Sequence, residues 1–283
     1  DPDPDPDPDP DPDPDPDPDP DPDPDPDPDP EPAVTVPTPG EAPRPEEVPA
    51  VEASEGSAPP GAEEELISLL ERRDGAIAPI ENRIARKLKR VLADEQGQVL
   101  DGVRRLRGHP SLDDILPVDE QVAAYAAVVG EDLVAAAEEG AAFEGASLPT
   151  SITVQEIVAE LARSLAGVVR SRVERCFDGG EDAEDTSDRL RATYREWKTD
   201  RLVEATRHHV LSAFGEGQCA VRPAGVLVRW VPDPASPACP DCEDDALAGS
   251  VPSGEPFPTG HVHPPAHPGC RCLVVGERVA APA

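Results

Sequence analysis

The chain has 283 residues, of which 59 are Asp or Glu and 25 are Lys or Arg, giving a formal net charge of -34. This surplus of negative charge argues against broad electrostatic binding to nucleic acid or to an anionic membrane, because both are polyanions. No apolar run approaches the roughly 18 residues that a membrane-spanning helix needs. The sequence contains no methionine and opens on Asp1. We therefore expect it to be part of a longer translation product, so that a leader upstream would not be visible.

The N-terminal part of the sequence is a repeat. Residues 1–30 are fifteen consecutive Asp-Pro dipeptides, followed by Glu31 and Pro32. Proline fixes φ at every second position and keeps the preceding Asp out of helix, which predicts an extended rod of about 3.1 Å per residue. Residues 33–61 continue as a Pro/Glu/Ala linker. We predict that residues 1–62 are a disordered spacer, with threading or weak cation binding as the alternative role.

Helical periodicity begins at Glu63. A short helix is predicted at 63–73, and Pro79 is expected to begin the next, long helix or to break it from the short one. The predicted core face of the long helix comprises Ile77, Ile80, Ile84, Leu88, Val91, Leu92, Val99, Val103 and Leu106. The basic residues of 80–107 fall mostly off that face. They could contact DNA phosphates, or simply form the solvated side of the helix.

Further helices follow. The Gly-His-Pro sequence at 108–110 predicts the end of the long helix. Helices are then predicted at 118–140, where small residues allow close packing, at 153–177, and at about 186–214. Their predicted core residues are Ile157, Leu161, Leu165, Val168, Val173, Leu190, Tyr194, Trp197 and Val210. Residues 63–215 are thus predicted to form an all-helical domain of about five helices.

The C-terminal part has a β pattern. Residues 225–231 are β-rich and bounded by turn residues, and residues 272–275 form a second short candidate strand. The segment between them is too short and polar to be held by burial alone. The predicted fold class is therefore mainly α: a helical domain followed by a small zinc-stapled, β-containing C-terminal module at 216–283, with a disordered Asp-Pro-rich N-terminus.

Residues 239–272, which run from the loop after the first candidate strand to the start of the second, hold four of the six cysteines and three of the six histidines. Two Cys pairs flank a long loop, so a single ion could join the candidate strands. We predict a structural zinc ion, with four ligands drawn from Cys239, Cys242, Cys270, Cys272 and His267. His261 and His263 are alternative imidazole ligands. A disulfide pair is the main rival interpretation, and it would require an oxidising compartment.

The sequence gives little support for catalysis at this site. The zinc-deaminase pattern needs H-x-E upstream of P-C-x-x-C, whereas these histidines follow the cysteines, and no H-E-x-x-H helix occurs. Glu243, Asp244 and Asp245 could supply a base, but an acidic run beside a turn is usually solvated. His208 and His209 are interpreted as surface and packing residues. Cys176 and Cys219 are interpreted as ordinary thiols outside the cluster.

Five stretches together resemble the phage head morphogenesis, or Mu F-like minor head, proteins. They are residues 194–199 (YREWKT), Trp230, residues 239–242 (CPDC), residues 254–260 (GEPFPTG) and residues 264–272 (PPAHPGCRC). The resemblance covers roughly 80 residues. The family often has Asn at the position of Gly269.

The resemblance implies a non-enzymatic minor capsid protein, active in capsid assembly at the portal vertex or in DNA delivery. Its expected partners are a portal or capsid protein, and DNA through the basic face of the 80–107 helix, with no membrane. Its expected location is the virion or the cytoplasm of the bacterial host, and a prophage copy would look the same. The alternative is a metal-dependent nuclease or hydrolase, in which His261, His263 or His267 binds the metal and water completes the shell.

Overall fold

A computed structural model of the chain describes residues 62–105, 111–178, 183–237 and 239–277. The predictions made for the Asp-Pro repeat and linker, for Leu106 and for the Gly-His-Pro stop lie outside these residues. The prediction of a mainly helical chain with a small C-terminal sheet is confirmed. Among the residues that the structure describes, no helix combines the length and the apolar character needed to span a bilayer.

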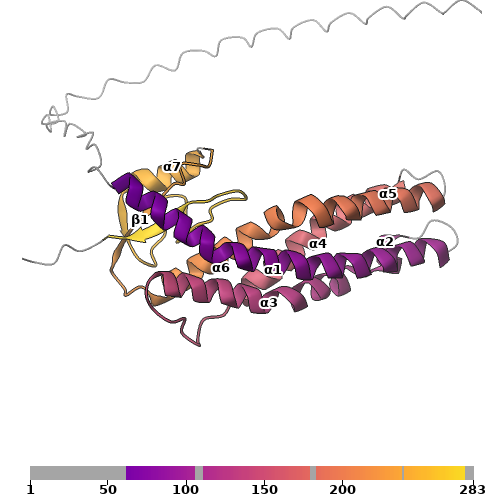
Figure 1. Cartoon of the computed structure of the whole chain (residues 1–283), viewed down its shortest axis with the longest axis horizontal. Helices are drawn as coiled ribbons and strands as arrows, with labels where there is room; N and C mark the ends of the chain where they lie inside the picture. Colours follow the sequence, from indigo (N-terminus) through magenta and orange to yellow (C-terminus); the bar gives the residue numbers. More distant parts are fainter. Residues whose placement is uncertain (1–61, 106–110, 179–182, 238, 278–283) are drawn as a thin grey trace, which may run out of the picture. The chain divides into compact units, whose positions relative to one another are not determined.

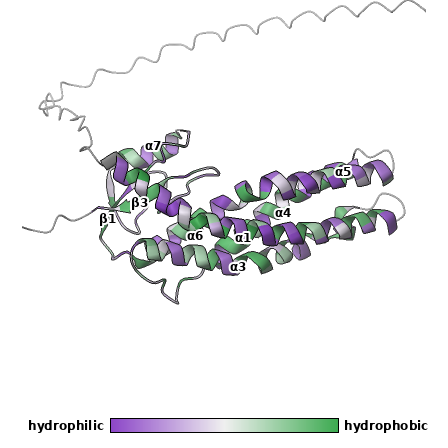
Figure 2. Cartoon of the chain, in the orientation of Figure 1, coloured by the Kyte–Doolittle hydropathy of each residue, from purple (hydrophilic) through white to green (hydrophobic). Residues whose placement is uncertain are grey.

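The helical part consists of long antiparallel segments. Its elements are α1 (Ala62–Arg105), α2 (Leu112–Ile115), α3 (Val118–Phe143), α4 (Gln155–Asp178), α5 (Ala183–Glu196), the π-helical turn η1 (Trp197–Arg201) and α6 (Leu202–Val221). Figure 1 shows α1 running beside α3 on one side and the α5 to α6 segment on the other. Helix α3 is largely hydrophobic in Figure 2, whereas α5 is mostly hydrophilic. This difference fits α3 as the central helix, which contacts α1, α4 and α6.

The C-terminal part is a three-stranded antiparallel sheet with one short helix. Strand β1 (Leu227–Val231) lies in the middle, paired with β2 (Ser250–Pro252) and β3 (Leu273–Gly276). The two candidate strands of the sequence correspond to β1 and β3. Strand β2 and helix α7 (Pro240–Leu247) were not predicted. Helix α7 begins with proline at its first position, where the missing N–H costs nothing.

The expected break at Pro79 is wrong, because α1 continues through this residue. A proline inside a helix loses one hydrogen bond and crowds the carbonyl four residues back, at a cost of about 3 kcal/mol. Here that carbonyl belongs to Gly75. Ile77 and Ile80 on either side are 3% and 2% exposed. Burying them contributes about 1.5–3 kcal/mol each, which offsets the cost and keeps the helix continuous.

The last predicted helix is also different from expectation. It divides into α5 and α6 around the π turn η1, and α6 runs to Val221, beyond the predicted end near 214. A π turn inserts an extra residue per turn and so rotates the helix face that follows it. Trp197 and Leu202, at the two ends of this turn, are both buried as a result.

Most of the predicted core residues are buried. Val168 is an exception, because its side chain is half exposed. Val91, Val103 and Ile157 lie at the margin of the core. The main core extends into the sheet through Leu273, which joins the buried residues of the helices. Helical periodicity thus predicts the buried faces correctly, except at Val168, which lies on the predicted core face but is exposed to solvent.

Close packing of α3 on α6 depends on two glycines. A β-carbon at Gly140 would overlap the carbonyl group of Phe214, and one at Gly217 would overlap the carbonyl group of Ala137. Neither backbone can retreat from the contact without separating the two helices. This confirms the predicted role of small residues in the 118–140 segment.

A polar network is buried in the bundle. Glu95 accepts hydrogen bonds from the hydroxyls of Tyr125 and Tyr194 at 2.6 and 2.7 Å, and from Gln121 Nε2 at 3.0 Å. Burial raises the pKa of the Glu95 carboxyl, and the three donors lower it in part. Glu95 lies on α1, Gln121 and Tyr125 lie on α3, and Tyr194 lies on α5, so the network fixes the relative positions of these three helices.

The Gly217→Ala substitution tests the close packing of α3 on α6. We expect it to lower the free energy of unfolding by about 2–3 kcal/mol, because the added methyl must push α3 away from α6. The matched control is Gly130→Ala in α3, where an added β-carbon meets nothing within 4 Å. That change should be neutral or stabilise by up to about 1 kcal/mol. Urea unfolding measures both, and equal effects would contradict the proposed contact.

Candidate metal centre

The predicted ligands sit at the ends of secondary structure around the sheet. Cys239 is the N-cap of α7 and Cys242 lies in its first turn, while Cys270 and Cys272 come directly before β3. The chain turns into the second pair at Gly269, whose φ of +87° lies in the left-handed region. Glycine and, next, asparagine occupy this region most readily. The backbone therefore explains why either residue suits this position.

The five predicted ligands lie together in two overlapping groups. Cys239, Cys242 and His267 form one group, and Cys242, Cys270 and Cys272 form the other, with the ligand atoms of each group within 4.8 Å of one another. The Cys242 Sγ atom belongs to both groups. It lies 3.4 Å from Nε2 of His267 and 3.7 Å from Sγ of Cys270. This Cys/His cluster could hold a metal ion; His261 and His263 belong to neither group.

A backbone hydrogen bond orients His267 for binding through Nε2. Its Nδ1 lies 2.9 Å from the carbonyl oxygen of Pro268, which can only accept, so Nδ1 carries the proton in this contact. The neutral ring then presents the lone pair of Nε2 toward Cys242. A second hydrogen bond of this kind is usual for histidines that bind metals.

The thiols influence one another strongly. A hydrogen bond from Cys272 lowers the pKa of the Cys270 thiol to about 5, and this same bond raises the pKa of Cys272. Burial raises the pKa of Cys242 to about 12. The cluster by itself therefore favours one thiolate among protonated neighbours. A cation would be needed to hold several thiolates this close together.

The cysteines share a small apolar core with the sheet. Val228, Trp230, Phe257 and Val274 are buried with Cys242, Cys270 and Cys272. The rings of Trp230 and Phe257 meet edge to face at 5.2 Å. Burial therefore holds this segment to a greater extent than its length and polarity predict, and the cysteines are part of the small core. All six cysteines are free thiols in the structure.

Two buried arginines attach this module to the helices. Arg73 of α1, 1% exposed, donates from Nη1 to the carbonyl oxygens of Arg271 and Cys272 at 2.6 and 3.0 Å. Arg222, at the end of α6, donates to the carbonyl oxygen of Val274 at 2.6 Å. Asp233 pairs with both Arg271 and Arg73. Nothing in the spacing of these residues signals their role, because their partners lie far away in the sequence.

The sequence predicts that the acidic run after Cys242 is solvated, and the structure agrees for only two of its three residues. Glu243 and Asp244 are exposed, but Asp245 is fully buried. Its carboxylate accepts from the backbone N–H and the hydroxyl of Thr259, at 3.1 and 2.8 Å. The Thr259 hydroxyl also lies 2.9 Å from Nδ1 of His261. Asp245 thus anchors the loop that carries the histidines.

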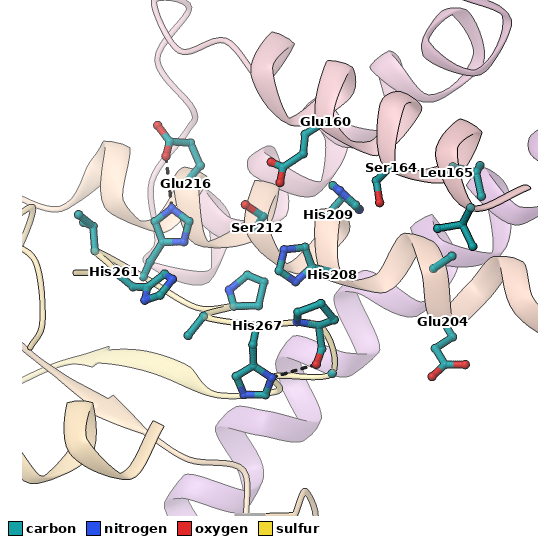
Figure 3. A pocket seen from close by; sticks show the side chains of 18 of the residues that line it. Glu160, Ser164, Leu165, Glu204, His208, His209, Ser212, Glu216, His261 and His267 are labelled. Atoms are coloured by element: carbon teal, nitrogen blue, oxygen red, sulfur yellow. Dashed lines mark hydrogen bonds and ion pairs between the residues drawn. The ribbon is translucent and has the colours of Figure 1, made fainter. Parts of the chain in front are cut away.

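A cavity of about 1200 Å³ lies beside the metal centre, between α4, α6 and residues 260–269. All five histidines in the described part of the chain line it: His208, His209, His261, His263 and His267. In Figure 3, His208 projects toward the loop that carries His261 and His267, while His209 lies on the α4 side near Glu160 and Ser164. The interpretation of His208 and His209 as surface and packing residues did not anticipate this cavity. His267 borders both the cavity and the metal cluster.

Comparison of the chain with protein-family models, with curated proteins and with solved structures finds no match. Its function therefore has to be argued from the arrangement of its own residues.

The buried His209 gives the fold a dependence on pH. Burial, and then the neighbouring His208, lower the pKa of His209 from 6.5 to about 4. The unfolded chain therefore takes up this proton first. Its contribution to stability is present above pH 6.5 and is lost as the pH falls toward 4, by about 2–3 kcal/mol in all.

We expect His209→Leu to remove that part of the acid destabilisation, because leucine keeps the position apolar and cannot be protonated. The free energy of unfolding in urea should fall less between pH 7.5 and 4.5 in the variant than in the unsubstituted chain. Parallel losses in the two proteins would show that His209 does not carry this effect.

Proposed function

We propose that the Cys/His cluster binds one zinc ion in a structural role. A tetrahedral site with Zn–S bonds of about 2.3 Å and Zn–N bonds of about 2.0–2.1 Å separates two sulfurs by about 3.8 Å and sulfur from nitrogen by about 3.6 Å. The Cys242 contacts of 3.7 Å to Cys270 and 3.4 Å to His267 are close to these values. Cys242 belongs to both three-residue groups, so it is a ligand whichever group contributes the larger share of the site.

We further propose that the protein is a phage-type minor head protein, acting in capsid assembly at the portal vertex or in DNA delivery. The observation that carries this proposal is the gathering of the residues behind the family resemblance. Trp230, Cys242, Phe257, Cys270 and Cys272 come from four of the five stretches and share one small core. A metal-stapled module fixed to a helical body by buried arginines suits a protein that works by binding others.

Contact with DNA through the 80–107 helix is a weaker part of the proposal. Arg83 and Lys87 each pair with Asp132 of α3 at 2.9 Å. Internal pairing of this kind reduces the charge available to phosphates. Lys89 and Arg90 are exposed and have no ion pair within the described part of the chain, so any DNA contact on this face would centre on them.

The alternative function, a metal-dependent nuclease or hydrolase, is favoured by one observation. His267 connects the metal cluster with the large cavity, where a substrate would have room. The carboxylates of Glu160 and Glu204 also line that cavity. They would repel the phosphates of a nucleic acid, so a nuclease is the less suitable form of this alternative.

The zinc assignment is tested with Cys242→Ser, compared with Cys219→Ser outside the cluster. We expect the unsubstituted chain and the Cys219 variant to retain about one zinc ion per chain, and the Cys242 variant to lose most of it. Elemental analysis measures the metal, and the absorption spectrum of the cobalt-substituted chain reports the ligands. A five-coordinate cobalt spectrum with few thiolate ligands would instead favour the hydrolase.

The assembly role is tested by mixing the full chain with portal rings of the phage or prophage that encodes it. We expect co-sedimentation of the zinc-loaded chain with the rings, and weaker association of the Cys242→Ser variant. Absence of binding to both portal and capsid protein would contradict the proposal. Turnover of a hydrolysable substrate that depends on Cys242 would replace it with the alternative.

A further inference from the structure

The cavity between α4, α6 and residues 260–269 has an elongated outline. On α6 it is lined by Glu204, His208, Ser212 and Glu216, which follow one another every four residues along one face. Twelve residues of helix span about 18 Å. An extended peptide rises about 3.3 Å per residue, so about five of its residues would lie along this face. The volume of about 1200 Å³ exceeds that of most sites for small ligands.

The lining carries carboxylates that form no ion pair within the described residues. Glu160 and Glu204 have no hydrogen bond or ion pair within the described residues, and both are exposed. The cavity's one arginine, Arg201, is paired with Glu196 at 3.1 Å. Glu216 lies 3.4 Å from Nε2 of His263. The remaining charge in the cavity is therefore negative.

Histidine side chains add further polar groups to the lining of the cavity. In the described part of the chain, Nδ1 of His208 is buried without a hydrogen-bond partner. The neighbouring His209 is only 5% exposed and bonds to the backbone of Ala205. A buried polar atom without a partner is costly, so a ligand that satisfied it would gain affinity.

The orientation of His261 shows what kind of partner the cavity requires. The carboxylate of Asp245 can only accept, so the Thr259 hydroxyl donates to it and must accept from Nδ1–H of His261. The neutral ring then keeps an acceptor lone pair at Nε2. Acceptors thus come from the loop as well as from Glu160 and Glu204, and they call for a ligand rich in N–H donors.

Apolar side chains lie among these polar groups. Val168 of α4 is 50% exposed and lines the cavity, together with Trp197, Ala205 and Pro265. A metal ion alone would not use these surfaces. The histidines and carboxylates of the cavity also do not converge: in the described residues, three donors approach within 4.8 Å only in the two groups centred on Cys242.

We propose that this cavity binds an extended basic segment of a partner protein, in which Lys or Arg side chains alternate with apolar ones. The charged side chains bind Glu160 and Glu204 and donate to Nε2 of His261, while the apolar ones cover Val168. Charge complementarity selects a basic partner over nucleic acid, and the length of the lining selects a peptide over a small cation. This inference does not depend on the phage assignment.

The test uses the full zinc-loaded chain and a capped peptide of alternating lysine and leucine, at about 0.15 M salt to screen distant charges. Two-dimensional spectra of the histidine side chains should shift on titration at His208 and His261. We expect Glu160→Gln combined with Glu204→Gln to weaken binding at least fivefold. The matched control, Glu138→Gln combined with Glu139→Gln on the exposed surface of α3, removes the same charge and should change binding less than twofold.

A second pair of variants separates the cavity from general attraction to an acidic chain. Val168→Lys places a cation in the cavity and should weaken binding at least fivefold. Val134→Lys, at another exposed valine on α3, should have little effect. Equal losses for cavity and control variants, or equal binding of a glutamate-leucine peptide, would overturn the proposal. Histidine shifts produced by added zinc and not by the peptide would show a second metal site instead.

Discussion

Helix α6 has no side chain at Gly215 or Gly217, and two neighbours approach it there. A β-carbon at Gly217 would overlap the backbone of α3, and one at Gly215 would overlap His263 and approach the carbonyl oxygen of Pro264 at 2.8 Å. The same helix therefore sets the spacing of the bundle and the seat of the histidine loop. Helix α6 and the histidine loop both line the cavity. The shape of the cavity therefore depends on the contact of α6 with α3 at Gly217 and on its contact with the loop at Gly215.

The Cys/His cluster is coupled to the helices through a buried arginine. Arg73 holds the carbonyls of Arg271 and Cys272, so it fixes the backbone at one of the ligands. Arg73 also forms an ion pair with the buried Asp233. Removing one partner from a buried ion pair typically costs about 3–5 kcal/mol, because the other charge is left uncompensated. Metal binding at the cluster and docking of the sheet on α1 are thus expected to stabilise each other. Such mutual support gives a short, polar segment a fixed position.

The loop that follows Phe257 serves two sites at once. His261, His263 and His267 each have Nδ1 next to an oxygen of the loop itself: the Thr259 hydroxyl, and the carbonyls of Pro264 and Pro268. Their Nε2 atoms are thereby directed to different surroundings. Nε2 of His267 lies against Cys242, and that of His263 lies against Glu216. One short loop can therefore contribute to a metal centre and to the wall of a cavity.

Patterns in the sequence are enough to predict most of the helices, most of their buried faces and the five members of the Cys/His cluster. Helical periodicity and paired cysteines are local patterns, and Cys239, Cys242, His267, Cys270 and Cys272 carry their chemistry wherever the chain places them. Tertiary contacts, in contrast, carry α1 through Pro79, bury Asp245 and bring Arg73 to Cys272. They also bring His208 and His209 into one cavity with His261. These outcomes depend on contacts between residues far apart in the chain, whose energies outweigh local preference and leave no mark in the spacing of the sequence.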